Sequence, residues 1–318
     1  MSARVAIAVV STNLRDLLGK TLESLKPDAD AGLVAVWVVD NASTDGSAEM
    51  VRERFPWVSL IASEENVGYG AAVNLVAERT ETEWLAAANE DIEVRSGAIQ
   101  CLLDAALDRP DVALLAPRLE LPDGSTQHSV HPFPTLWLAL VFNLGLHRLS
   151  RAFADQLCIE GYWNPARPRP VDWAMATFLL ARRAAWEEIG GFDPAQWMHA
   201  EDLDIAWRMR QAGWRTRYEP SAEVFHVGSA ASKKAFGDEL MTRFMAASYG
   251  WQARRRSPAV ARAIALLNCA GVAARLVALE PPARVCGGRF ARARDGCRYW
   301  LGVHRSGLAT SAELLSRR

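Results

Sequence analysis

Carboxylate and amide side chains follow several apolar runs of this 318-residue chain, at places where a ligand could reach them. Asp40 follows one such run, and its carboxylate could accept the imide N–H of a pyrimidine base. Asn89-Glu90-Asp91 follows another, where acidic oxygens suit a Mg²⁺ or Mn²⁺ ion that bridges to a diphosphate. Taken alone, each group has a commoner structural explanation. Asp40 could form an Asx turn or cap a helix, and the acidic triplet could be an exposed turn.

A short glycine loop, Asn66–Gly70, precedes a predicted helix that carries Asn74. Backbone N–H groups at the N-terminus of a helix can approach a phosphate. A lone Gly-x-Gly is a weak signal, however, and this one does not follow the first predicted strand, as the glycine fingerprint of a dinucleotide-binding enzyme does. The missing fingerprint argues against a nucleotide-cofactor oxidoreductase on a doubly wound fold.

Two further groups could supply a general base and a metal ligand. Glu201-Asp202-Leu203-Asp204 opens a predicted helix, and a carboxylate that faces a pocket there could take the proton of an attacking alcohol. His226 could ligate a metal through a neutral imidazole. Acidic residues in a first helical turn also complement the helix dipole, and a single histidine is more often structural. The order and combination of the groups, rather than any one of them, favour a shared function.

Alternating strands and helices must position these groups. The alternation predicts a parallel sheet that is covered by helices on both faces. Ligands of such sheets bind beyond the carboxyl ends of the strands, where Asp40 and Asn89 fall. The predicted strands are Val5–Ser11, Val34–Val39, Val58–Ala62, Trp84–Ala88 and Val112–Ala116, and the predicted helices between them are Leu14–Leu25, Ala48–Arg54, Ala71–Glu78 and Ala98–Leu107.

The regular pattern weakens between residues 131 and 170, where prolines and aromatic residues are frequent, and we expect a variable insertion or lid there. We expect one domain over residues 1–235 and a helical extension over residues 236–318. In the second part of the domain the predicted elements are a strand at Phe178–Ala181, helices at Ala184–Ile189 and Asp202–Ala212, and short extended pieces at Arg215–Tyr218 and Glu223–His226.

The C-terminal extension combines apolar and basic residues. The formal net charge of the whole chain is −1, which does not favour nucleic-acid binding, but arginines far outnumber acidic residues after Arg254. The segment Pro258–Leu279 is mostly Ala, Leu and Val, and its interruption by Arg262, Asn268 and Arg275 argues against a membrane span. An amphipathic helix on an anionic surface fits this pattern, and a helix packed on the core is the commoner alternative.

Taken together, six stretches of the chain resemble the motifs of the family 2 glycosyltransferases of the GT-A fold, in that family's order. The resemblance covers roughly residues 3–235 and is specific as a set. Within the family, the chain is most similar to bacterial rhamnosyltransferases that use dTDP-rhamnose on lipid-linked cell-wall intermediates. The six stretches are VVDNASTDGS (Val38–Ser47), ENVGYGAAVN (Glu65–Asn74), ANEDI (Ala88–Ile92), GGFDP (Gly190–Pro194), AEDLDIAWRMRQAGW (Ala200–Trp214) and HVGSAAS (His226–Ser232).

The resemblance implies a GT-A fold, which is a Rossmann-like mixed sheet flanked by helices, here with a C-terminal helical extension. It implies that Asp202 is the base of an inverting sugar transfer, with Glu201 orienting nearby groups or contacting the acceptor. Asp91 would hold Mg²⁺ or Mn²⁺, and His226 would complete the shell of the ion. The nucleotide and donor residues would be Ser11, Asn13, Asp40, Asn41, Asn66, Gly68, Asn74, Asn89, Glu90 and Trp173.

The chain departs from the family pattern at four places. The acidic metal motif usually begins with Asp, or reads Asn-Pro-Asp in the rhamnosyltransferase branch, whereas here it is Asn89-Glu90-Asp91, so that Glu90 could add a ligand or alter the metal preference. Thr12 stands where the family usually has an aromatic residue. Ala176-Thr177 replaces a Gly-Ser or Gly-Ala pair, and His199 replaces an aromatic residue. We expect the last two changes to alter the fit of the acceptor or the sugar.

The expected activity is the transfer of a sugar, best rhamnose from dTDP-rhamnose, to an acceptor hydroxyl in cell-wall or surface polysaccharide synthesis. One alternative is a glycosyltransferase that uses another UDP-, dTDP- or GDP-sugar or a natural-product acceptor. Another is a non-catalytic scaffold that binds nucleotide sugars. We expect a cytoplasmic protein with a lipid-linked glycan as a candidate acceptor and with peripheral contact to the inner face of the plasma membrane.

Overall fold

The computed structural model describes residues 3–196, 198–228 and 237–316. The chain divides into two compact units, and each is described here by itself. Unit 1 comprises Met1–Phe133 and Leu157–Ala235, and unit 2 comprises Pro134–Gln156 and Phe236–Arg318. Residues 134–156, which we expected to belong to an insertion over 131–170, therefore cluster with the C-terminal helices instead of with the sheet.

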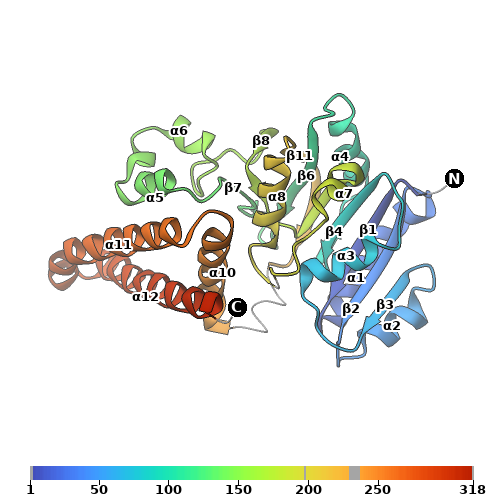
Figure 1. The fold of residues 1–318 in the computed structure, drawn as a ribbon, viewed down its shortest axis with the longest axis horizontal. Helices are drawn as coiled ribbons and strands as arrows, with labels where there is room; N and C mark the ends of the chain where they lie inside the picture. Colours follow the sequence, from blue (N-terminus) through green and yellow to red (C-terminus); the bar gives the residue numbers. More distant parts are fainter. Residues whose placement is uncertain (1–2, 197, 229–236, 317–318) are drawn as a thin grey trace. The chain divides into compact units, whose positions relative to one another are not determined.

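Unit 1 is built on a mixed nine-stranded sheet in the order β3-β2-β1-β4-β10-β6-β11-β5, with β8 pairing to β11 (Figure 1). The first half of the sheet is parallel, because each strand returns through a helix. Its strands are β1 (Val5–Ser11), β2 (Val34–Asn41), β3 (Ser59–Ser63) and β4 (Trp84–Asn89). The register sets Ser11 beside Asp40, and Val10 beside Asn89, so the predicted ligand-binding residues lie at one edge of the sheet.

The second half of the sheet contains antiparallel strands. β10 (Phe178–Arg182) inserts between β4 and β6 (Val112–Glu120) and runs antiparallel to both. β11 runs from Arg215 to His226 as one strand with a register shift between Glu219 and Glu223, where the sequence predicted two separate pieces. The remaining strands are β5 (Ile92–Val94) and β8 (Arg169–Val171), and β7 (Val130–His131) pairs with β9 (Trp173–Ala174) in a separate small sheet.

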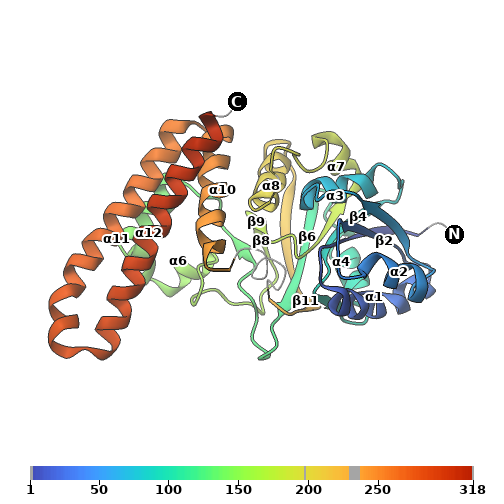
Figure 2. The same cartoon turned by 90° about the horizontal axis from the view of Figure 1, so that it is seen from below.

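Helices cover both faces of the sheet, with α1 and α4 on one side and α3 and α7 on the other (Figure 2). Alternate residues of β1 divide between the two faces, as the strand period requires. Val5, Ile7 and Val9 pack into a core with leucines of α1 and α4. The helices of unit 1 are α1 (Arg15–Asp30), α2 (Ser47–Arg54), α3 (Tyr69–Ala77), α4 (Ala98–Ala106), α7 (Arg183–Ile189) and α8 (Glu201–Gln211). The predicted Rossmann-like mixed sheet with flanking helices is confirmed.

Unit 2 is helical throughout the residues that the structure describes. Its long helices are α10 (Leu240–Arg255), α11 (Pro258–Cys286) and α12 (Gly288–Ser316), and α11 and α12 form a hairpin (Figure 1). A small core of Ala139, Tyr249, Ile264 and Ala265 joins the helices. The shorter elements are α5 (Leu136–Asn143), η1 (Leu146–Arg148), α6 (Arg151–Gln156) and η2 (Gly237–Glu239).

Candidate active site

Glu90 connects the end of β1 to the acidic triplet that follows β4. The Ser11 hydroxyl donates to Glu90 Oε2 at 2.6 Å, and the Thr12 backbone N–H donates to Glu90 Oε1 at 2.6 Å. Glu90 is 3% exposed, and burial raises its pKa to about 7 although both hydrogen bonds lower it. Both oxygens of this carboxylate are thus engaged in holding the loop after β1. Thr12 stands at the position where an aromatic side chain was expected from the resemblance. Here the hydrogen bond from the Thr12 backbone N–H to Glu90 holds the loop.

The loop after β2 leaves two buried acceptors unused among the described residues. Asn13 has a φ of 60° and accepts the Thr44 backbone N–H at 2.7 Å, which joins the loops after β1 and β2. The Ser43 N–H reaches Asp40 Oδ2 at 3.3 Å, as in an Asx turn. Asp40 Oδ1 and Asn41 Oδ1 are buried without a hydrogen-bond partner. Because buried acceptors are normally satisfied, these two oxygens fit a ligand that donates hydrogen bonds.

The glycine loop is braced by its own side chains. The Gly68 N–H donates to Asn66 Oδ1 at 2.9 Å, and Asn41 Nδ2 lies 3.5 Å from the carbonyl oxygen of Gly68. Gly68 has a φ of 88° and ends the loop directly before α3. Gly70 permits close packing, since a Cβ there would lie 2.8 Å from Phe192 Cβ. The loop therefore presents backbone toward the end of β2, and its second glycine serves packing.

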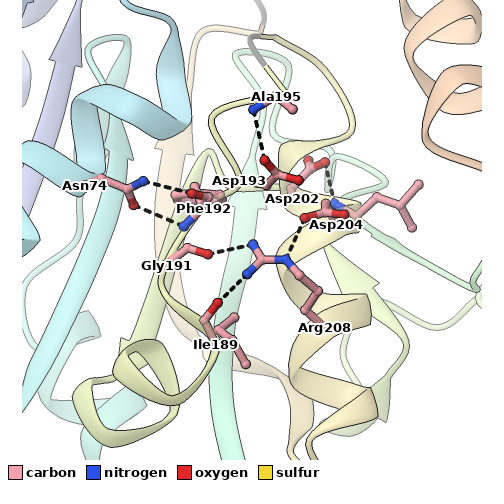
Figure 3. A network of polar contacts seen from close by, with 10 residues as sticks. Asn74, Ile189, Gly191, Phe192, Asp193, Ala195, Asp202, Asp204 and Arg208 are labelled. Carbon is pink, nitrogen blue, oxygen red and sulfur yellow. Dashed lines mark hydrogen bonds and ion pairs between the residues drawn. The ribbon is translucent and has the colours of Figure 1, made fainter. Parts of the chain in front are cut away.

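Asn74 lies on α3 and holds the loop of the Gly190–Pro194 motif (Figure 3). Its Nδ2 donates to the Phe192 carbonyl at 2.8 Å, and its Oδ1 accepts the Phe192 N–H at 3.0 Å. We expected Asn74 to border the nucleotide directly. In the structure both polar atoms of the amide are taken up by this backbone pair, so the side chain positions a loop.

Asp204 and Arg208 secure the same loop from α8 (Figure 3). Arg208 Nε lies 2.7 Å from Asp204 Oδ2, and the other guanidinium nitrogens donate to the carbonyls of Ile189 and Gly191 at 2.8 and 2.5 Å. Asp204 has no exposed surface. Of the acidic residues that open α8, this one is therefore committed to an ion pair that supports the fold.

Asp91 and His226 meet where β5 and β11 pair. His226 Nε2 lies 3.3 Å from Asp91 Oδ1, and His226 Nδ1 lies 2.6 Å from Gln127 Oε1. Asp91 is 3% exposed and His226 is 1% exposed. If Nδ1–H donates a hydrogen bond to Gln127 Oε1, the neutral ring has no proton on Nε2, and the lone pair of Nε2 faces a carboxylate oxygen. Two acceptors facing each other in a buried site suit a shared cation. The later part of the predicted His226–Ser232 motif, from Ser229, lies outside the described residues.

Glu201 and Asp202 form a pair of adjacent carboxylates at the start of α8. Asp202 Oδ1 accepts the Leu203 N–H at 2.8 Å, and the Asp202 carboxylate also accepts the backbone N–H of Ala176. Glu201 Oε2 is buried and has no hydrogen-bond partner among the described residues. Burial raises the pKa of both groups, and the Asp202 charge raises the pKa of Glu201 further. When the two carboxylates hold one proton between them, that proton is therefore on Glu201, and Asp202 is the group that stays ionised.

Tyr69 shows that these groups converge. Its hydroxyl donates to the Ala176 carbonyl at 2.5 Å, so that Ala176 connects α3 with Asp202. Burial raises the pKa of Tyr69 well above its usual value, and the nearby charges of Glu201, Asp202 and Asp91 raise it further. Asn89 joins the same region, because its N–H donates to the Thr177 carbonyl at 2.9 Å. The replaced Ala176-Thr177 pair thus lies between the acidic triplet and the start of α8.

Trp173 belongs to an aromatic cluster rather than to the carboxylate group. Its Nε1–H donates to the Pro132 carbonyl at 3.0 Å, and its ring stacks on His131 with centroids 4.4 Å apart. The side chain is 7% exposed. A direct hydrogen bond from Trp173 to a donor would have to replace the bond to Pro132.

The sequence did not identify several residues of this site. Tyr69 stands between the two glycines of the loop, and its aromatic type is the one signal that it gave. Gln127 gave none, because its pairing with His226 spans 99 positions. The Asp204–Arg208 pair is separated by four residues on a helix, and this spacing alone would have predicted it.

Comparison with known proteins relates the chain to a family. Residues 6–157 match the model of glycosyl transferase family 2. Over these residues the chain is similar to this family. The N-acetylglucosaminyl-diphospho-decaprenol L-rhamnosyltransferase of Mycobacterium tuberculosis is 36% identical over 208 residues, which cover 61% of the present chain. The match spans 66% of that relative, slightly less than two thirds of its length.

Two other comparisons also find glycosyltransferases. The rhamnosyltransferase WbbL of Escherichia coli K12 is 28% identical over 130 residues, which cover 41% of the present chain and 46% of WbbL. The mannosyltransferase PcManGT from Pyrobaculum calidifontis, solved in complex with GDP-Man and Mn²⁺, superposes with a TM-score of 0.64 at 18% identity. That superposition covers 100% of this chain and 88% of PcManGT, and it supports the GT-A-like fold.

Proposed function

We propose that this chain is an inverting glycosyltransferase that moves a sugar from a nucleoside-diphosphate donor to an acceptor hydroxyl. The observation that carries the proposal is the convergence of two different groups around Tyr69. One is a carboxylate pair that suits a base, and the other is an acidic residue paired with a histidine, which suits a cation. The match of residues 6–157 to glycosyl transferase family 2 supports the same reaction class.

The nucleotide site lies at the carboxyl ends of β1 and β2 in this proposal. The unpartnered oxygens of Asp40 and Asn41 accept N–H groups of the base. Ser11 and Glu90 hold the loop that carries Asn13, and the Asn66–Gly68 turn leads into the N-terminus of α3, whose first backbone N–H groups would approach the diphosphate. Asn89 and Trp173 would also lie near the donor. Asn89 holds the backbone at Thr177 in place, and Trp173 holds the backbone at Pro132.

Asp202 acts as the base. Its carboxylate is held by two backbone N–H groups, so its orientation is set before the acceptor arrives. It takes the proton of the acceptor hydroxyl while the oxygen attacks the anomeric carbon, and the bond to the diphosphate breaks on the opposite face. Glu201 keeps its proton more readily and can donate a hydrogen bond to the acceptor or the sugar.

Asp91 and His226 fit a divalent cation, Mg²⁺ or Mn²⁺. They supply one carboxylate oxygen and one imidazole nitrogen that already face each other. The described residues hold no group of three or more His, Cys, Asp or Glu side chains that could bind a metal by themselves. The remaining ligands would therefore come from the donor diphosphate and water. When bound, the ion offsets the negative charge that develops on the leaving diphosphate.

The finer assignment follows the names of the relatives. We propose L-rhamnose as the donor sugar, and a polyprenyl-diphosphate-linked N-acetylglucosamine as the acceptor class. The nucleotide dTDP is proposed from the sequence resemblance alone. An acceptor of that kind resides in a membrane, and the reaction would take place at a membrane surface.

A donor screen by thermal shift tests the proposal. The protein is heated with dTDP-rhamnose, UDP-glucose, GDP-mannose or NAD⁺, each with and without Mn²⁺. We expect one nucleotide sugar to raise the midpoint, more with Mn²⁺ than without, since a ligand that binds the folded state stabilises it. Asp91→Asn should remove the Mn²⁺-dependent part, and Asp123→Asn, an exposed carboxylate outside the site, should not. A shift with NAD⁺ alone would contradict the proposal.

A further inference from the structure

The solvent-exposed face of α11 in unit 2 is apolar along almost the whole helix. Exposed residues recur at intervals of three and four, which places them on one side of the helix. Val277 is 73% exposed, Val285 is 86% exposed and Leu266 is 62% exposed. This face, called the α11 stripe below, consists of Ala259, Ala263, Leu266, Ala270, Ala274, Val277, Pro281 and Val285.

The stripe is not the core face of the helix. The packed side of α11 carries Ile264 and Ala265, which are buried against α5 and α10. Asn268 donates to the Tyr249 hydroxyl at 3.3 Å and accepts from Asn143 at 2.9 Å, so this polar residue of α11 points into unit 2, whereas Arg262 and Arg284 are exposed. A helix at the surface of a soluble protein normally has the opposite pattern, with polar residues outside. One face of α11 thus packs on a helical core, and the opposite face is exposed and apolar.

Length and composition would let α11 cross a membrane. Its most apolar window has a mean hydropathy of 1.6, and 17% of that window is buried. The packed face argues against a span, because Arg275 donates to Asn143 Oδ1 at 3.2 Å and helps to tie α11 to α5. Its hairpin partner α12 contains several arginines, and charged side chains are costly in the core of a bilayer. A helix that is packed on one side and apolar on the other fits the plane of a membrane surface.

The charges around the stripe are almost all positive. Between Pro258 and Ala309 the acidic residues are Glu280 and Asp295, and both are already paired with arginines. Five arginines of this segment form no ion pair with a carboxylate among the described residues: Arg262, Arg275, Arg289, Arg292 and Arg305. Two copies that met through this surface would bring like charges together. An anionic surface would neutralise them.

A groove on the same hairpin has the character of a lipid contact. It has a volume of about 480 Å³. Leu276 and Leu301 provide apolar walls, and Arg298 and Arg305 provide cationic ones. Apolar and cationic groups side by side suit the boundary between acyl chains and phosphate headgroups.

We propose that the α11 stripe lies flat on a bilayer of anionic phospholipid, with its alanines, leucine and valines at the level of the upper acyl chains. The surrounding arginines then contact lipid phosphates. The stripe would extend for about 40 Å along the surface, at a rise of about 1.5 Å per residue. The inference rests on the surface of unit 2 and holds whichever sugar unit 1 transfers.

Co-sedimentation of the full-length protein with vesicles tests this surface. One vesicle contains equal parts of phosphatidylglycerol and phosphatidylcholine, and the other contains phosphatidylcholine alone. We expect binding to the anionic vesicle that weakens with salt. Val277→Asp should lower the partition coefficient about tenfold or more, because an aspartate is costly among acyl chains. The matched control Leu107→Asp changes an apolar side chain of unit 1 that is 68% exposed, and it should bind like wild type.

Val277 is largely exposed, and circular dichroism checks that the variant stays folded. Leu266→Asp provides a second, independent change in the stripe. Equal binding of wild type and both stripe variants would overturn the proposal. So would an absence of binding to anionic vesicles. A wild-type dimer in sedimentation velocity that Val277→Asp dissociates, without vesicle binding, would show that a second copy of the chain covers the stripe instead.

Discussion

The two units of the molecule place polar and apolar groups in opposite ways. Unit 1 buries carboxylates in its candidate site, since Asp40, Glu90 and Asp91 are each at most 4% exposed. Unit 2 exposes hydrocarbon, with Val277 and Val285 more than 70% exposed. Both arrangements cost free energy in water, and a fold keeps such features mainly where another molecule binds.

The difference concerns the kind of partner. Buried carboxylates with fixed hydrogen bonds suit small polar ligands and a proton transfer, because each group is oriented before the ligand arrives. An exposed apolar stripe among arginines needs no precise geometry, and it suits an extended surface that is apolar and anionic. In the proposals above, the chemistry therefore belongs to unit 1 and the membrane attachment to unit 2.

The largest effect should come from exchanging two aspartates that lie two positions apart on α8. Asp202→Asn removes the proposed base, and kcat should fall about 10²- to 10⁴-fold with little loss of stability. Asp204→Asn leaves Arg208 without its carboxylate, and the free energy of unfolding should fall by about 3 kcal/mol with kcat within tenfold of wild type. Steady-state kinetics and denaturant unfolding of both variants measure this. A large loss of stability in Asp202→Asn, together with a large loss of kcat in Asp204→Asn, would contradict the roles assigned to the two residues.

A smaller difference, in the free energy of unfolding, should distinguish one glycine of unit 1 from one glycine of unit 2. Gly191 has a φ of 71°, and a Cβ there would lie 2.6 Å from Asn74 Oδ1 and 2.8 Å from Trp186 Nε1. Gly191→Ala should therefore lower the free energy of unfolding by about 2–4 kcal/mol. Gly296 lies in α12, and a Cβ added there would meet no other atom within 4 Å. Gly296→Ala should raise stability by up to about 1 kcal/mol. Equal effects of the two changes in denaturant unfolding would contradict the assigned packing of Gly191.

The sequence predicted much of unit 1 because its signals are local. The first strand was predicted at the residues that the structure gives to β1, and the ends of β2 and β4 place Asp40 and Asn89 at one edge of the sheet as expected. The contacts that complete the site are not local. Tyr69 reaches Ala176 across 107 positions, and no period or motif reports such a pairing.

The sequence was less informative for unit 2, for a different physical reason. A run of Ala, Leu and Val has the same composition whether its outward face meets protein or lipid. The position of each residue on the helix decides between these cases, and it became visible only when Asn268 and Arg275 were found on the packed side.

In unit 1, the role of Asn74 likewise depended on its contact with Phe192, 118 positions away.

The pH dependence of kcat/KM tests the central claim most directly. Burial raises the pKa of Asp202 above the ordinary aspartate value of about 4. Because the base must be ionised, activity should be lost as the pH falls through this raised pKa, and it should be retained above it. The account predicts an acid limb well above pH 4 for wild type, and no such limb in the residual activity of Asp202→Asn. A wild-type rate that stays flat down to about pH 4 would contradict the assignment of Asp202 as the base.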